Sequence, residues 1–269
     1  MSVYAKPGLE PMAHALREAM KTATMNYLHT YYPESRFGGF TDVDGTITFY
    51  TRVQSLMRPS SITLDVGCGR GMYGEDPVDA RRERRILKGR CAKVIGIDVD
   101  LAGKGNPYID EFRRIEGPRW PLEDESVDML VCDYVLEHVE DPESFFSESR
   151  RALRPGGHLC IRTTNVRSYI GLISRMTPNN LHVSLLRKAR HCKKEEDIFP
   201  TTYRCNTRRK ITSMLDKYGF DNCVYEYESE PYYLSFSRFF YRLGVLHQRF
   251  AFRPFKAALF AFARKQVNE

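Results

Sequence analysis

The sequence predicts an α/β fold built on a mostly parallel sheet, because short apolar runs alternate with helical stretches along its 269 residues. One run at 62–67 leads into a glycine-rich turn, and a second at 93–98 ends in acidic residues about thirty positions later. Continuous apolar runs of this length are typical of strands that helices cover on both faces. Further strands are predicted at 127–132, 157–163, 220–228 and 258–265, and helices at 9–30, 46–57, 78–88, 142–153, 166–175, 181–190 and 207–218.

The segment Ile109–Arg119 is charged and does not read as an ordinary strand. No basic N-terminal segment followed by an apolar core is present, and the longest apolar stretch, near Ala257–Ala263, is too short to cross a bilayer. Seven cysteines without a C-x-x-C pair indicate reduced thiols, with Cys132 and Cys160 as small core residues. The composition therefore predicts a cytoplasmic α/β protein with appendages.

A glycine-rich turn follows the first predicted strand, with Asp65 two residues before Gly67. Glycine lets the backbone turn sharply and approach a ligand closely. The dinucleotide fingerprint would need a third glycine at position 72, where Met72 stands instead. The negative charge of Asp65 beside the turn suits a cationic amino group better than a pyrophosphate, so the turn favours a zwitterionic ligand.

Acidic residues also end the second predicted strand, at Asp98 and Asp100. A carboxylate in this position can accept hydrogen bonds from both hydroxyls of a ribose, and Asp98 is the first candidate and Asp100 the second. The alternative is that Asp98 only caps the next turn.

Five ordered segments together carry a family resemblance: Asp65–Gly71, Ile97–Asp98, Pro121–Asp128, Val135–Val139 and Leu153–Gly157. In that order they resemble the class I S-adenosylmethionine-dependent methyltransferases, and within them the methyltransferase type 11 subgroup that contains the quinone-pathway enzymes. The resemblance covers about residues 60 to 165. It implies a doubly wound, Rossmann-like sheet of seven strands with helices on both faces and a C-terminal antiparallel strand. It also implies S-adenosylmethionine as the cofactor.

The resemblance implies a role for each matching residue. Asp65 would lie near the amino group of the methionine moiety, Asp98 would hold the ribose, and Glu116 would lie near the adenine amino group. The glycines and Gly117 would supply backbone contacts, and the Cys68 side chain could face the ligand. The cofactor-binding residues expected in this way are Asp65, Gly67, Cys68, Gly69, Gly71, Asp98, Val99, Glu116, Gly117 and Asp133.

The catalytic candidates follow the strand predicted at 127–132. They are Asp133, Tyr134 and His138. Asp133 and Tyr134 are expected to border the sulfonium and the methyl group. His138 has a suitable intrinsic pKa to accept a proton from a hydroxyl nucleophile. The alternative is that its imidazole only forms a hydrogen bond to the backbone and holds the turn. Tyr134 stands where some quinone-pathway relatives carry a metal-binding acid, so no metal is predicted.

The chain is expected to divide into four parts. Residues 1–58 form N-terminal helices that cover the cofactor pocket, 59–165 the S-adenosylmethionine-binding core, and 166–206 a lid over the substrate. Residues 207–269 complete the sheet and hold an inserted helix at about 233–253.

The inserted helix is basic and amphipathic. Arg238, Arg242, Arg249 and Arg253 recur on one face, and Phe239, Phe240, Leu243, Leu246 and Phe250 fall mainly on another. Such a helix can lie in the interface of an anionic membrane, or its apolar face can pack on the domain as in an ordinary helix.

A second basic cluster includes Arg187, Lys188, Arg190, Lys193 and Lys194 and continues at Arg208, Arg209 and Lys210. It could attract a phosphate-bearing substrate or be plain surface charge. RNA is disfavoured, because aromatic residues do not interleave with the cluster.

The sequence therefore predicts an S-adenosylmethionine-dependent methyltransferase that O-methylates a small-molecule, glycan or lipid-linked acceptor. The alternatives are an RNA methyltransferase, a nicotinamide-dependent oxidoreductase and a noncatalytic S-adenosylmethionine-binding protein. Neither the acceptor's identity nor the oligomeric state follows from the sequence.

Overall fold

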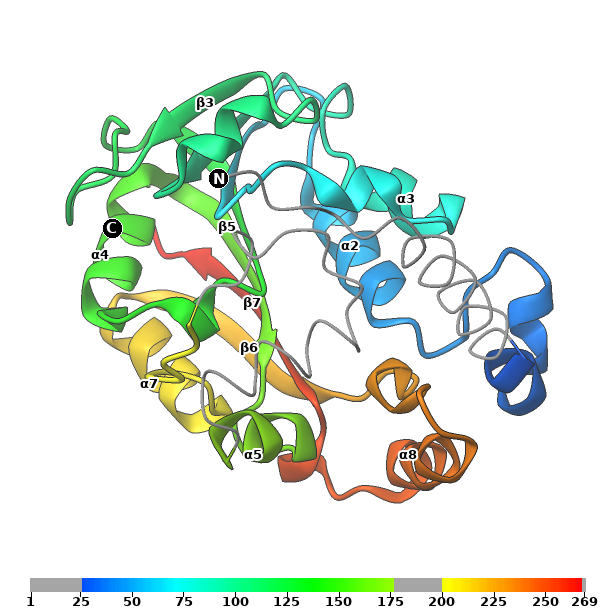
Figure 1. Cartoon of the computed structure of the whole chain (residues 1–269). Coiled ribbons are helices and arrows are strands. Elements are labelled where there is room, and N and C mark those ends of the chain that lie inside the picture. The colour runs from blue at the N-terminus through cyan, green and yellow to red at the C-terminus, as the bar shows by residue number, and fades with distance from the viewer. Residues whose placement is uncertain (1–25, 177–199, 268–269) are drawn as a thin grey trace, which may run out of the picture.

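One seven-stranded sheet organises the molecule, in the strand order β3-β2-β1-β4-β5-β7-β6. The computed structural model describes residues 26–176 and 200–267. Strands β1 to β5 pair in parallel, whereas β7 runs antiparallel to both of its neighbours, β5 and β6. The predicted Rossmann-like sheet with a C-terminal antiparallel strand is confirmed (Figure 1).

The predicted strands and helices lie close to their expected positions, with ends that differ by a few residues. The strands are β1 Ile62–Val66, β2 Lys93–Asp98, β3 Glu111–Arg114, β4 Val127–Asp133, β5 Leu153–Thr164, β6 Phe220–Tyr227 and β7 Ala258–Lys265. The helices are α2 Gly45–Leu56, α3 Asp79–Arg85, α4 Pro142–Ala152, α5 Tyr169–Met176, α7 Arg208–Lys217 and α8 Arg238–Phe250.

Strand β3 is the element that the sequence pattern did not predict. It lies at the edge of the sheet and pairs only with β2, from Ile95 opposite Glu111 to Asp98 opposite Arg114. Its charged side chains lie partly in solvent, where Glu111 forms ion pairs with Arg113 and Lys93. The expectation that 109–119 is not an ordinary strand is therefore wrong for four residues, because an edge strand needs no continuous apolar run.

Several predictions fall outside the described residues. These are most of the helix at 9–30, of which residues 26–31 are helical, the helix at 181–190, and the basic cluster from Arg187 to Lys194.

Helices pack on both faces of the sheet, as predicted. On one face Leu130 of β4 packs with Phe146 of α4 and Leu215 of α7. On the other, Met129 of β4 packs with Phe49 of α2. Figure 1 shows the same arrangement, with α4 and α7 on one side and α2 and α3 on the other. Alternate residues of β4 therefore enter opposite cores.

Cys132 and Cys160 are fully buried in β4 and β5, which confirms them as core residues. In the described part of the chain the cysteines are free thiols.

The carboxyl ends of six strands meet at one edge of the sheet. Strands β1 to β5 are parallel, and β5 and β6 both pair antiparallel with β7, so β6 runs in the same direction as β5. Helix α8, which follows β6, therefore leaves the sheet at the edge where parallel α/β sheets bind their ligands. Within residues 26–176 and 200–267 no helix is long and apolar enough to span a bilayer.

Two glycines in the turn after β1 allow a matched test of the packing there. Gly67 and Gly69 both have positive φ, of 67° and 50°. A Cβ on Gly67 would lie 2.4 Å from Val135 Cγ2, whereas one on Gly69 would meet nothing within 4 Å. We expect Gly69→Ala to lower the free energy of unfolding by about 1 to 2 kcal/mol from backbone strain, and Gly67→Ala by about 2 kcal/mol more from overpacking.

Urea unfolding followed by circular dichroism measures both variants. Equal losses would show that Val135 moves aside without cost.

Candidate functional site

The turn after β1 forms an open backbone cradle. Gly67, Gly69 and Gly71 all have positive φ, between 50° and 76°. The N–H of Gly67 donates to the carbonyl of Ile97 on β2 at 2.8 Å, which ties the turn to the neighbouring strand. The open space around Gly69 leaves room for a ligand to approach the backbone.

Asp98 ends β2 and holds this cradle in place. Its Oδ2 accepts a hydrogen bond from the N–H of Gly69 and its Oδ1 one from the N–H of Asp100, each at 2.9 Å. Asp98 therefore caps the next turn, which was the alternative to a role in binding a ribose. A carboxylate has about four acceptor positions, so two remain for the hydroxyls of a ribose and both roles are compatible.

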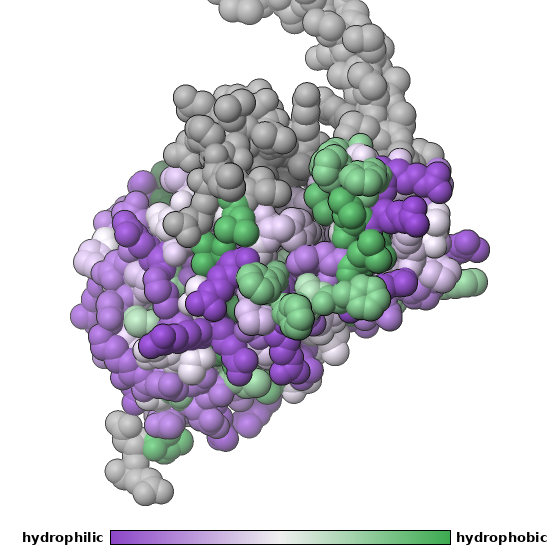
Figure 2. Space-filling model, turned by 90° about the horizontal axis from the view of Figure 1, so that it is seen from below, coloured by the Kyte–Doolittle hydropathy of each residue, from purple (hydrophilic) through white to green (hydrophobic). Residues whose placement is uncertain are grey.

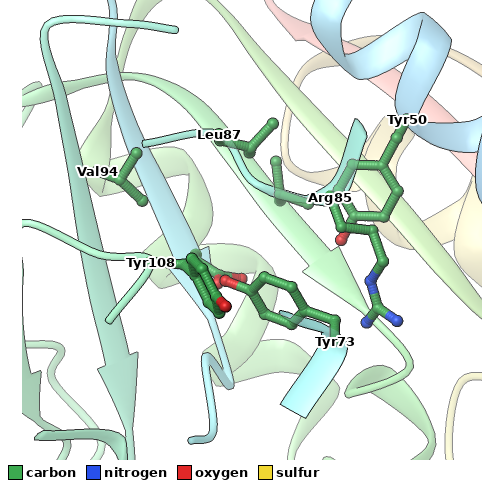
Figure 3. Close-up of a pocket in the computed structure, with 8 residues that line it drawn as sticks. Tyr50, Tyr73, Arg85, Leu87, Val94 and Tyr108 are labelled. Carbon is green, nitrogen blue, oxygen red and sulfur yellow. The ribbon is translucent and has the colours of Figure 1, made fainter. Parts of the chain in front are cut away.

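Asp65, near the end of β1, lines a small cavity with Tyr50, Tyr73, Arg85 and Tyr108 (Figure 3). The rings of Tyr73 and Tyr108 lie 5.4 Å apart. Burial, together with the negative charge of Asp133, raises the pKa of Asp65 to about 7, although Arg85 acts in the opposite direction. A carboxylate with a raised pKa is stabilised when a cation binds beside it.

Asp133, the last residue of β4, joins three other elements. It accepts from Arg162 of β5 at 2.6 and 2.7 Å and from the Tyr50 hydroxyl of α2 at 3.0 Å. Arg85 of α3 lies 3.4 Å away. Burial raises the pKa of Asp133, but the charge of Arg162 and its hydrogen bonds outweigh burial, so the net pKa is lowered.

Arg162 is buried in β5 and completes the same cluster. It is 3% exposed and donates to the Thr46 hydroxyl of α2 at 3.0 Å as well as to Asp133. Its guanidinium lies 4.8 Å from the ring centre of Tyr134 and 5.2 Å from that of Phe49. Helix α2 is thereby held over the carboxyl end of the sheet.

Tyr134 follows Asp133 in a left-handed backbone conformation with φ of 55°. Such a conformation costs a non-glycine residue about 1 to 3 kcal/mol and is concentrated at functional sites. The N–H of Tyr134 donates to the carbonyl of Arg162 at 2.8 Å, and its side chain is 40% exposed. Tyr134 is therefore partly accessible to solvent beside the Asp133 cluster, while burial raises the pKa of its hydroxyl.

His138 ends the 3₁₀ turn Leu136–His138, and its Nδ1 lies 2.9 Å from the carbonyl oxygen of Pro200. A carbonyl only accepts, so Nδ1 donates, and a neutral ring then carries its lone pair on Nε2. The preceding Glu137 is buried and accepts from Thr163 and Thr164 at 2.7 and 3.1 Å. Backbone N–H groups of residues 202 and 203 donate to the Glu137 carbonyl, so this turn anchors the chain from residue 200 onward.

Three of the cofactor residues expected from sequence are exposed to solvent, and the side chain of a fourth is buried in the core. Val99, Glu116 and Gly117 are exposed, and Glu116 lies 3.7 Å from Arg114 in an ion pair just beyond β3. The expectation that the Cys68 side chain faces the ligand is wrong. This side chain is buried in the core between β2 and the following turn, because the glycines on either side have left-handed backbone conformations that direct it inward. Only the backbone of Cys68 belongs to the turn.

Sequence reasoning missed Arg162, Arg85 and Tyr50. Arg162 did leave a signal, since it interrupts an otherwise apolar strand and a charged residue there needs a buried partner. Arg85 lies in the arginine-rich stretch 81–85, where nothing in the sequence separates it from its neighbours. Among the residues for which positions are described, no group of three or more His, Cys, Asp or Glu side chains is placed to hold a metal ion.

Comparison with known proteins agrees with this geometry. Residues 64–161 match the family model described as "Methyltransferase domain". This part of the chain is therefore similar to the class I S-adenosylmethionine-dependent methyltransferases. The match runs from within β1 into β5 and includes the glycine turn, Asp98 and Asp133, but it ends before Arg162.

Curated methyltransferases resemble the same part of the chain. A probable S-adenosylmethionine-dependent methyltransferase of Mycolicibacterium smegmatis is 36% identical over 107 residues, which are 38% of this chain and 37% of that protein. A ubiquinone biosynthesis O-methyltransferase of Acinetobacter baumannii is 30% identical over 137 residues, 44% of this chain and 54% of that protein. The chain thus aligns with about half or less of the length of these relatives.

A solved S-adenosylmethionine-dependent methyltransferase from Thermotoga maritima has the same fold. It superposes with a TM-score of 0.52 at 14% identity and covers 92% of this chain and 100% of its own.

The residues of this site fit S-adenosylmethionine, the cofactor of the methyltransferases that the chain resembles. The cradle at Gly69 is open, Asp98 retains acceptor positions, and Asp65 is a carboxylate that a cation would stabilise. The Nε of Arg85, buried beside Asp65, has no hydrogen-bond partner in the described structure. A zwitterionic ligand offers both a cation for the first group and a carboxylate for the second.

Removing the charge of Asp133 tests the buried cluster. Asp133→Asn leaves the buried Arg162 without its counter-ion, so we expect the free energy of unfolding to fall by about 3 kcal/mol. Asp79→Asn, which breaks the exposed pair with Arg82, is the control, and its cost should be less than about 1 kcal/mol. Urea unfolding at neutral pH measures both, and similar small losses would contradict the role of Asp133.

Proposed function

We propose that the chain transfers the methyl group of S-adenosylmethionine to a hydroxyl of a small-molecule, glycan or lipid-linked acceptor. One observation carries the proposal. A cation-accepting carboxylate, Asp65, and an open glycine cradle held by Asp98 lie at the carboxyl ends of β1 and β2. The partly exposed Tyr134 directly follows β4, the strand next to β1.

Binding is the first task of the residues at the donor side. Asp65 would pair with the amino group of the methionine moiety, Asp98 would accept the ribose hydroxyls, and the backbone at Gly69 would approach the ligand. When bound, the cofactor supplies a methyl group on a cationic sulfonium. Because attack on this group disperses charge, alignment and exclusion of water account for most of the catalysis.

The acceptor side would be bounded by Tyr134 and by the first turn of α2, where Thr46 bonds to Arg162. A hydroxyl nucleophile must lose its proton, and His138 is the proposed base, since its Nδ1 bond to Pro200 favours the tautomer with Nε2 as acceptor. The same bond would position the chain from residue 200 onward beside the acceptor. His138 would therefore act both in orienting this segment and in accepting the proton.

Oxygen is the proposed acceptor atom. The curated relative from Acinetobacter baumannii is an O-methyltransferase by name and aligns through this part of the chain. The nicotinamide alternative lacks support at the turn, because Met72 is 45% exposed where the dinucleotide fingerprint needs a glycine packed between helix and strand.

Transfer of a labelled methyl group tests the activity. We expect the purified chain to label one pool when incubated with labelled S-adenosylmethionine and a cell extract fractionated into lipids, soluble metabolites, protein and RNA. The lipid or metabolite pool should be labelled, and mass spectrometry of the labelled product should place the methyl group on an ether oxygen. Labelled RNA would overturn the acceptor class, and cofactor binding with no labelled pool would support a noncatalytic protein.

The Asp98 side chain should contribute to cofactor affinity. We expect Asp98→Ala to weaken binding of S-adenosylhomocysteine by about 1 to 3 kcal/mol, because ribose hydroxyls lose a charged acceptor. Asp100→Ala is the control, since Asp100 only caps the turn that follows, through the N–H of Ala102 at 2.9 Å. Isothermal titration calorimetry measures both, and equal affinities would remove Asp98 from the site.

Cofactor affinity should fall in acid because of Asp65. Its pKa of about 7 means that below pH 7 a proton must leave the carboxyl before an ammonium group can bind. The dissociation constant should therefore rise by up to about tenfold for each pH unit below 7 and be flat above it.

Asp65→Asn should bind weakly at every pH and lose the slope. Glu228→Gln is the matched control, because burial raises the pKa of Glu228 to about 7 as well, and Glu228 follows β6, which β4, β5 and β7 separate from β1. A slope that persists in Asp65→Asn would assign the titration to another group.

A further inference from the structure

Large apolar side chains are concentrated on one surface of the inserted segment between β6 and β7. Eight of the sixteen exposed large hydrophobic side chains of the described structure lie within residues 236–255. We call them the α8 surface: Phe236, Phe239, Phe240, Leu243, Leu246, Phe250, Phe252 and Phe255. Soluble proteins rarely leave so many large apolar groups together in water, so a partner is expected here.

Packing in the domain does not account for this surface, because α8 is anchored by its opposite side. Tyr241, Gly244 and Val245 are its buried residues. The Tyr241 ring lies 5.7 and 5.8 Å from those of Tyr27 and Tyr31. The side chains of the apolar face predicted from the sequence, from Phe239 to Phe250, are instead 45% to 76% exposed. The alternative of an ordinary helix packed through that face is therefore wrong.

Positive charge adjoins the apolar side chains. At about 100° per residue, Arg238, Arg242 and Arg249 form a row along α8 between the buried side and the apolar side. All three are exposed, as is Arg253 beyond the helix. Residues 231–256 contain five Lys or Arg and no Asp or Glu. Figure 2 shows hydrophobic side chains gathered on this face of the molecule, with strongly hydrophilic groups directly beside them.

A convex helix with a phenylalanine and leucine face, a row of arginines beside it and no acid fits the headgroup region of an anionic bilayer. The apolar rings enter the boundary with the acyl chains, and the arginine stems extend toward the lipid phosphates. Each basic residue near such a surface adds roughly 1 kcal/mol of attraction.

The position of α8 connects this surface to the methyltransferase site. The helix follows β6, whose carboxyl end lies at the same edge of the sheet as Asp98 and Asp133. The ring of His247 in α8 lies 5.1 Å from that of Tyr169 in α5, the first helix after β5. A surface attached here would hold the acceptor edge of the sheet against the lipid.

We propose that the α8 surface docks this protein on membranes that contain anionic lipids, with α8 in the plane of the headgroups. The docking goes beyond the proposed methyl transfer and does not depend on it. A protein that binds vesicles but methylates no acceptor would support the docking proposal and contradict the proposed methyl transfer.

Vesicle flotation with the full chain tests the docking. The chain should float with phosphatidylcholine vesicles that contain about a third phosphatidylglycerol and remain below with pure phosphatidylcholine. Phe239→Ser with Leu243→Ser and Phe250→Ser should lower the partition coefficient by more than about tenfold, because buried apolar area is lost. Arg238→Gln with Arg242→Gln should lower it by about fivefold for each charge and reduce its dependence on salt.

The matched controls are Phe37→Ser, at a side chain 83% exposed elsewhere on the molecule, and Arg119→Gln, whose side chain is 71% exposed. Neither should change flotation. An unchanged far-UV spectrum and melting temperature for each variant verify the fold, which substitutions of exposed side chains should preserve.

A second measurement does not rely on loss of binding. Phe250→Trp should show a blue-shifted emission with the anionic vesicles and quenching by brominated lipid, whereas the wild type, with its buried Trp120, should show neither. Failure of the wild type to float, or flotation unchanged by the apolar substitutions, would overturn the proposal. So would a dimer, found by sedimentation without lipid, that the same substitutions dissociate.

Discussion

The carboxylate of Asp133 is the point at which the site of this protein is held together. Arg162, Tyr50 and Arg85 approach it from β5, α2 and α3, so three elements far apart in sequence are fixed around the end of β4. The pair with Arg162 keeps Asp133 ionised although it is buried, and its charge helps to raise the pKa of Asp65. The protein thus saturates the carboxylate of Asp133, whereas the carboxylate of Asp65 is the proposed partner of a ligand's cation.

The direction of the strands decides what lies next to this cluster. Because β7 is antiparallel to both β5 and β6, the carboxyl end of β6 shares an edge with those of β1 to β5. The insertion that carries α8 therefore starts beside the site rather than at the opposite end of the sheet. The proposed donor site, Tyr134 and an apolar, basic surface thus share one edge of the sheet, an arrangement that is consistent with the proposed docking on a membrane.

Much of the fold could be predicted because each buried parallel strand carries its own apolar run, and each glycine or capping residue acts within a few positions. Strand β3 was missed for the same reason, since an edge strand is stabilised by pairing with β2 and leaves its charges in solvent. In the site, Asp65, the glycine turn and Asp98 could be predicted because they lie at strand ends. Glu116 was placed by analogy of spacing, and its side chain lies in an exposed segment, 77% accessible to solvent.

The sequence by itself determined the alternation of strands and helices, the glycine turn, the acids near the ends of β1 and β2, and the amphipathic character of α8. Only the tertiary structure decided that Arg162 neutralises Asp133, that the Cys68 side chain points into the core, and that α8 exposes its apolar face. The physical reason is that periodicity shows which side chains share a face. Whether that face is buried depends on partners such as Tyr27 and Tyr31, more than two hundred residues away from α8.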